Sequence, residues 1–109
     1  MDWDVELVVV IGKEAKNVPK DKAMDYVFGY TIAQDISARD WQGRNGGQFL
    51  LGKSMDTFCP LGPAVVHKSL IKDVYNLNVK TIINGVEKQN GNTGQLIFKI
   101  DDVIHRLTQ

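Results

Sequence analysis

Hydrophobic and polar positions alternate near the start of the chain, between residues 3 and 11. One side of this stretch is apolar throughout, whereas the other side changes from acidic, at Asp4 and Glu6, to apolar, at Val8 and Val10. A period of two is typical of a β-strand. The change of character predicts that one end of the strand faces solvent or a polar site and that the other end is buried on both sides. Gly12 is expected to end the strand.

The stretch that follows contains three further predicted elements. Pro19 is well placed for the first turn of a short helix that runs to about Val27. Residues 28–33 have strand character, and residues 35–42 then change to a helical spacing. Gly43–Gly47 is predicted to be a glycine-rich loop.

The C-terminal half predicts a hairpin and a helix. Leu77–Ile83 alternates and is rich in β-branched residues, and Asn84-Gly85 behind it is a strong signal for a two-residue hairpin turn. Residues 95–99 are interpreted as another strand, and Asp101–Leu107 has the spacing of a short amphipathic helix. Several strands with short helices predict a β-rich α+β fold in one domain, residues 1–109. Its sheet edges are expected to be covered by further chain or by a partner.

Composition and charge exclude several classes of protein. Of the 109 residues 43% are hydrophobic and 24% charged, as in an ordinary globular domain. Thirteen basic residues balance thirteen acidic ones, so no positive field favours nucleic acid or an anionic membrane as a partner. The longest apolar run, Leu7–Ile11, is far shorter than the ~20 residues that cross a bilayer. The acidic start does not read as a targeting peptide, and a single cysteine fits a reducing compartment such as the cytoplasm.

The first candidate for chemistry is the acidic pair Asp4 and Glu6. Two residues apart on a strand, their side chains leave the same face about 6–7 Å apart and can lean toward one ion. Magnesium and calcium both prefer carboxylate oxygens, and a third carboxylate would complete such a site. The alternative at this point is a solvated strand face, on which alternate acidic residues are common.

A second candidate is the set Asp35, Arg39 and Gln42. The spacing i, i+4, i+7 predicts that they share one face of a helical turn. A carboxylate for a metal, a guanidinium for a substrate carboxylate and an amide for an enol or keto oxygen would form a small-anion site. The alternative is that Asp35 caps the helix and forms an exposed ion pair with Arg39.

Lys53 is the third candidate. Gly52 beside it allows close backbone approach, so the ammonium could hold an oxyanion, although an exposed lysine is the plain alternative. The segment Gly47–Ser54 matches the phosphate-binding loop pattern by letter, but no clear strand leads into it and no good helix follows. Isolated His67 and His105 are expected to have surface or core roles, and Cys59 is expected to be a buried small hydrophobe.

Taken together, these motifs resemble the fumarylacetoacetate hydrolase family. The ordered matches are Asp4–Leu7, Val10–Lys13, Gly29–Gln42 and Leu51–Pro63, followed by Asn84-Gly85 and Gln89. The resemblance covers nearly the whole chain but only the central part of the family's catalytic domain. The chain is closest to a branch of the family associated with mitochondria.

The resemblance implies a fold, a cofactor and a set of site residues. The fold would be part of a mixed β-sandwich or roll, truncated at both ends, and the full-length protein would be a homodimer. The metal, magnesium in the first place and manganese or calcium otherwise, would be bound by Asp4, Glu6 and Asp35. The family's first ligand is normally Glu, where this chain has the shorter Asp4. Arg39, Gln42 and Lys53 match positions that contact substrate or stabilise developing negative charge.

The implied activity is metal-dependent chemistry on small 2-oxo or 1,3-dicarbonyl acids, such as an acylpyruvate. Hydrolytic carbon–carbon cleavage, decarboxylation and keto–enol tautomerisation all proceed through a stabilised enolate, and the sequence does not choose among them. The family's lid with its proton-transfer residues, and its later glycine-rich segment, fall outside the matched positions. The alternative is therefore a non-catalytic fragment or a dimerisation module.

Overall fold

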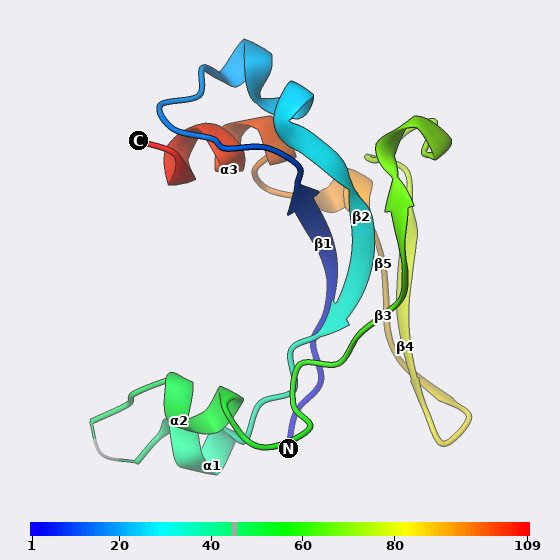
Figure 1. Ribbon diagram of the computed structural model, residues 1–109. Helices are drawn as coiled ribbons and strands as arrows, with labels where there is room; N and C mark the ends of the chain where they lie inside the picture. Colours follow the sequence, from blue (N-terminus) through cyan, green and yellow to red (C-terminus); the bar gives the residue numbers. More distant parts are fainter. Residues whose placement is uncertain (45) are drawn as a thin grey trace.

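The computed structural model describes residues 1–44 and 46–109 and arranges them in two small sheets with short helices at both ends (Figure 1). The strands are β1 (Val5–Ile11), β2 (Val27–Gln34), β3 (Leu61–His67), β4 (Asn78–Ile83) and β5 (Val86–Asn92). The α-helices are α1 (Arg39–Gln42), α2 (Leu50–Lys53) and α3 (Ile100–Leu107). Three 3₁₀ turns, η1 (Lys20–Tyr26), η2 (Lys68–Leu70) and η3 (Thr93–Gln95), connect them.

The first sheet is antiparallel with the order β1-β2-β3. The predicted strands at residues 3–11 and 28–33 are confirmed as β1 and β2, but the end of β1 that was expected to be buried on both sides is only partly buried, and Ile11 is exposed. Val5 pairs with Gln34 at one end of the two strands, and Ile11 pairs with Val27 at the other. This pairing places the acidic start of β1 beside the end of β2.

The second sheet is the β4–β5 hairpin, which the sequence predicted from Asn84-Gly85. Both turn residues have positive φ, 51° and 77°, as a type I′ turn requires. Thr81 lies opposite Gln89, and the register shifts directly after this pair. Such a bulge changes the direction of side chains on the strand that carries the extra residue.

The hydrophobic core lies where β2, η1 and α3 meet. The predicted amphipathic helix is confirmed as α3, whose inward face carries buried Ile100 and Ile104. They pack with Val18, which is fully buried, and with Tyr30 of β2. The rest of the buried cluster is Ala23, Val27 and Val74.

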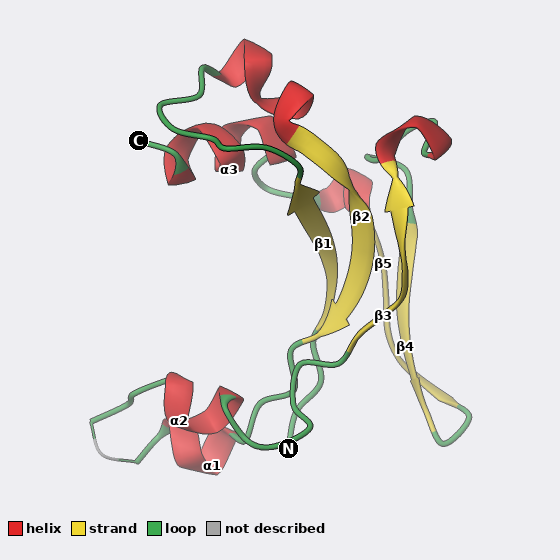
Figure 2. Ribbon diagram, viewed as in Figure 1, coloured by secondary structure: helices red, strands yellow, loops and turns green. Residues whose placement is uncertain are grey.

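Three details of the predicted elements are corrected. Residues 95–99 are not a strand: a 3₁₀ turn ends at Gln95 and the chain then reaches α3 in irregular backbone, drawn as loop in Figure 2. The helix expected after Pro19 is a 3₁₀ helix rather than an α-helix. The helix expected over residues 35–42 begins only at Arg39. The predicted loop Gly43–Gly47 contains residue 45, which lies outside the described residues.

The architecture is β-rich α+β, as predicted. Among the described residues, none of the helices is long and apolar enough to cross a bilayer.

Candidate active site

Three carboxylates converge where β1 begins and β2 ends. Asp4 and Glu6 leave the same side of the first strand, and the backbone N–H of Asp35 donates to the Asp4 carbonyl at 2.8 Å. Each of the three side chains offers one oxygen, and these oxygens lie within 4.8 Å of one another. Asp4 and Asp35 are partly buried, whereas Glu6 is exposed. The antiparallel crossing of the chain therefore assembles a cluster from residues about thirty positions apart.

The carboxylates repel one another. Partial desolvation, followed by the nearby charges of Asp35 and Asp4, raises the pKa of Glu6, and Lys53 acts in the opposite direction. The Lys53 ammonium forms an ion pair with Asp35 and donates to Ser37 Oγ at 3.0 Å. Three carboxylates and one ammonium leave two negative charges, which a single divalent cation would neutralise.

The donor set fits a hard cation. All three side chains offer carboxylate oxygens, the ligands that Mg²⁺, Mn²⁺ and Ca²⁺ prefer. Their oxygens are already close together, although nearby negative charges keep carboxylates apart unless a cation offsets them. The residues present are thus suited to hold a divalent ion.

Asp35, Arg39 and Gln42 do not share a helical face, which corrects the prediction from their spacing. Residues 35–37 lie outside the helix, and Ser37 forms an isolated antiparallel bridge with Asp2 through two hydrogen bonds of 2.8 and 3.0 Å. Asp35 consequently projects from the end of β2, outside α1. Ala38, not Asp35, precedes the helix, so the alternative of an Asp35 cap is also wrong.

The partner of Arg39 is Asp2. Both Nε and Nη2 of the guanidinium lie 2.9 Å from Asp2 Oδ2, and Nη1 donates to Gln42 Oε1 at 3.0 Å. The hydrogen bond from Arg39 is the main reason that the pKa of Asp2 is lowered. Arg39 is therefore held in one orientation at the start of α1.

Gln42 is the buried member of this group, with 7% of its surface exposed. Its Oε1 accepts from Arg39, but within the described part of the chain its Nε2 has no hydrogen-bond partner. Buried amide donors are normally satisfied, so this N–H is available to an acceptor from outside the chain. Gly52 of α2 packs against Gln42, and its carbonyl accepts a hydrogen bond from the Ala38 N–H at 2.8 Å, which fixes α2 beside α1.

Several contributing residues were missed by sequence reasoning. Asp2, Ser37, Gln34 and Thr81 all make polar contacts around the cluster. Of these four residues, only Asp2 could have been noticed in the sequence, because it belongs to the acidic start of the chain. The others depend on pairings between distant segments.

The remaining candidate groups lie outside the cluster. His67 packs its ring edge-on against Phe28, and His105 Nδ1 lies 2.7 Å from the Val18 carbonyl. Cys59 is exposed rather than buried, and it lies in a bend with a φ of 57°.

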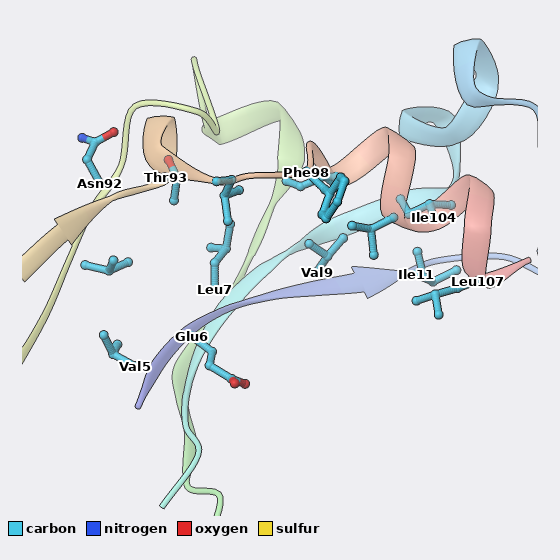
Figure 3. Close-up of a pocket in the computed structure, with 14 residues that line it drawn as sticks. Val5, Glu6, Leu7, Val9, Ile11, Asn92, Thr93, Phe98, Ile104 and Leu107 are labelled. Carbon is cyan, nitrogen blue, oxygen red and sulfur yellow. The ribbon is translucent and has the colours of Figure 1, made fainter. Parts of the chain in front are cut away.

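An apolar hollow of about 460 Å³ lies between β1 and α3, next to Glu6 (Figure 3). Leu7, Val9, Phe98 and Ile104 line it, and Glu6 is its charged residue. A site for a small polar acid needs several convergent polar groups. Besides Glu6, the polar residues among its described lining are Asn92 and Thr93, whose side chains already hydrogen-bond within the chain, so the carboxylate cluster is the better candidate.

Comparison with known proteins identifies the family of the chain. The sequence matches the family described as fumarylacetoacetate (FAA) hydrolase C-terminal over residues 1–109. The chain belongs to this family. The resemblance drawn from its motifs is therefore confirmed, and so is the fold class.

Members of the fumarylacetoacetate hydrolase family supply the following relatives. The mitochondrial oxaloacetate tautomerase Fahd2a of Rattus norvegicus is 52% identical over 109 residues, which is all of this chain and 35% of that protein. The fumarylacetoacetate hydrolase of Exiguobacterium antarcticum is 33% identical with a TM-score of 0.91, over 98% of this chain and 38% of that one. Fumarylpyruvate hydrolase of Pseudomonas aeruginosa, solved with Mn²⁺ and pyruvate, is 28% identical with a TM-score of 0.87, over 97% and 46%. The chain thus spans about a third of the length of the curated relatives it matches.

Proposed function

We propose that this chain carries the metal site of an enzyme that enolises small 2-oxo acids, with keto–enol tautomerisation of an oxaloacetate-like acid as the reaction. The observation that carries the proposal is the convergence of Asp4, Glu6 and Asp35, whose oxygens lie within 4.8 Å of one another. A relative over the full length of the chain is named an oxaloacetate tautomerase, and a similar structure contains Mn²⁺ and pyruvate. Both names support a divalent cation and a small keto acid.

The residues around the cluster suit such a substrate. A bound divalent cation would supply Lewis acidity, which stabilises the negative charge of an enolate. The guanidinium of Arg39, oriented by Asp2, would bind a substrate carboxylate. The Gln42 amide, whose N–H lacks a partner among the described residues, would donate to a substrate oxygen. Lys53, next to Asp35, would add positive charge where negative charge develops.

Finer points stay predictions. Magnesium as the specific ion and a homodimeric full-length protein rest on the family resemblance alone. Mitochondrial location of the whole protein has the support of the relatives' names. Hydrolysis and decarboxylation are the alternative outcomes of the same enolate, and hydrolases are among the similar structures.

The proposal is tested by titrating the purified chain with Mn²⁺ and following the free ion by electron paramagnetic resonance. We expect one bound ion per chain and a loss of affinity of at least tenfold in Asp35→Asn, which removes a charged ligand. Asp40→Asn is the matched control, because Asp40 is exposed and its nearest cation is Arg44 at 3.8 Å.

The same samples are then assayed for loss of the ultraviolet absorbance of enol-oxaloacetate, with and without chelator. We expect an ion-dependent rate that Asp35→Asn lowers and Asp40→Asn leaves unchanged. Failure of the unmodified chain to bind Mn²⁺, or a rate indifferent to chelator, would refute the proposed function.

A further inference from the structure

A closed ring of hydrogen bonds joins the carboxylate cluster to the β4–β5 hairpin. The backbone N–H of Asp4 donates to Gln34 Oε1 at 2.5 Å, and Gln34 Nε2 donates to Thr81 Oγ1 at 2.9 Å. The Thr81 hydroxyl donates to Gln89 Oε1 at 2.8 Å. Gln89 Nε2 completes the ring with a long hydrogen bond of 3.5 Å to Asp4 Oδ1.

The direction of every bond in this ring is determined by backbone donors. A backbone N–H can only donate, so the N–H of Asp4 fixes the oxygen of the Gln34 amide and directs its nitrogen to Thr81. The N–H of Val5 likewise donates to Gln89 Oε1, at 2.9 Å. The nitrogen of the Gln89 amide must therefore face the Asp4 carboxylate.

Thr81 links the two amides. Only 5% of its surface is exposed, and its single hydroxyl accepts from Gln34 and donates to Gln89. Valine has nearly the same shape but no hydroxyl, so it would remove the acceptor of Gln34 Nε2 and the donor to Gln89 Oε1, both at partly buried amides. The register shift of the hairpin falls directly after the Thr81–Gln89 pair, which keeps the two side chains opposite each other beside β1.

We propose that Thr81 and Gln89 are positioning residues for Asp4, and that through it they set the affinity of the cluster for a divalent cation. The proposal rests on the metal site of the proposed function. Asp4 has one rotatable bond before its carboxyl carbon and lies directly before the first residue of β1. The hydrogen bond that Oδ1 accepts from Gln89 holds the Asp4 carboxylate in one orientation, and Oδ2 takes no part in the ring. Hydrogen-bond partners behind a metal ligand typically account for about 10–100-fold in affinity.

The test is the Mn²⁺ affinity of four variants of the chain, with thermal unfolding in chelator as the measure of folding. Gln89→Met and Thr81→Val keep approximate size and remove the hydrogen bonds, so we expect each to weaken Mn²⁺ binding by about tenfold. Thr81→Ser keeps the hydroxyl and is expected to bind within about twofold of the unmodified chain. Asn90→Ala is the matched control, because it removes only an exposed bond to Glu87 on the same strand.

The outcomes separate this inference from the proposed function. If the unmodified chain binds Mn²⁺ and both Gln89→Met and Thr81→Val bind it with the same affinity, the positioning role is overturned and the metal site of the proposed function is retained. A loss in Thr81→Ser as large as in Thr81→Val also overturns it, because the hydroxyl would then be irrelevant. If both Gln89→Met and Thr81→Val fail to fold, the ring has a structural role only, and the positioning role is overturned. An unmodified chain that binds no Mn²⁺ overturns the proposed function and the inference together.

Discussion

Gly52→Ala tests how α2 is held against α1. A Cβ at this position would lie 2.4 Å from Gln42 Cγ and 2.7 Å from the Ala38 carbonyl oxygen. Gln42 is buried, and Ala38 is fixed by the hydrogen bonds that its carbonyl accepts from Trp41 and Gln42. Neither neighbour can give way. To restore carbon–carbon separations of about 3.5 Å, α2 must move by roughly 1 Å.

The cost follows from these contacts. Overpacking of this kind costs about 1–3 kcal/mol, and loss of the bond from Ala38 N–H to Gly52 adds about 1 kcal/mol. The lower chain entropy of alanine offsets about 0.4–1 kcal/mol. We therefore expect a net destabilisation of about 1–3.5 kcal/mol, together with displacement of Lys53 from Asp35.

Hydrogen exchange is the appropriate assay, because α1 and α2 pack together at one end of the molecule, away from α3 and the core (Figure 1). Elements at an end can open without global unfolding. Amides of residues 41–43 and 51–54 should exchange faster in Gly52→Ala. Urea unfolding should measure how much of the destabilisation lowers the free energy of global unfolding. Gly43→Ala is the matched control: its φ of −77° suits alanine and its nearest neighbours lie at 3.8 and 3.9 Å. Unchanged exchange and a stability within about 0.5 kcal/mol of the unmodified chain in Gly52→Ala would refute the reasoning.

Two further predictions concern the fold. Thr93 is buried, donates to the Val74 carbonyl at 2.6 Å and accepts from the Leu77 N–H at 3.0 Å, so Thr93→Val should lower the free energy of unfolding by about 1–3 kcal/mol in urea titrations. Thr93→Ser should recover most of that loss; equal loss in both variants would contradict the argument. Hydrogen bonding to Arg106, aided by Lys20, lowers the pKa of Asp102 below its usual 3.8. The stability that this lowered pKa contributes is complete above pH 3.8 and disappears as the pH falls through the lower pKa of the folded state. Asp102→Asn should abolish that part of the pH dependence of unfolding in acid. An unchanged pH profile in this variant would exclude the contribution of Asp102.

Local pattern was sufficient for elements whose partners are near in sequence. The alternation of β1, the Asn84-Gly85 turn and the apolar face of α3 each depend on neighbouring residues, and all three predictions are confirmed. Residues 95–99 were misread because an apolar run cannot say whether a strand partner exists; Ile97 is 91% exposed. Tertiary context overrides propensity in such segments.

The candidate site was less accessible to sequence reasoning. Alternation placed Asp4 and Glu6 on one face, but Asp35 was assigned to a helix because the backbone bonds between Ser37 and Asp2 are invisible to a local window. The placement of Thr81 opposite Gln89 depends on the cross-strand register, which shifts directly after this pair. Local spacing offered Asp35 as a carboxylate for a metal, but only the family resemblance grouped it with Asp4 and Glu6.

The antiparallel pairing of β1 and β2 also separates the carboxylates from the connection between the strands. Seven residues of β1 at about 3.3 Å each place that connection roughly 20 Å away. Glu14 and Lys16 lie there with exposed side chains. An affinity handle or fluorophore attached at either residue would immobilise or report on the chain while the end that carries the three carboxylates stays free in solution.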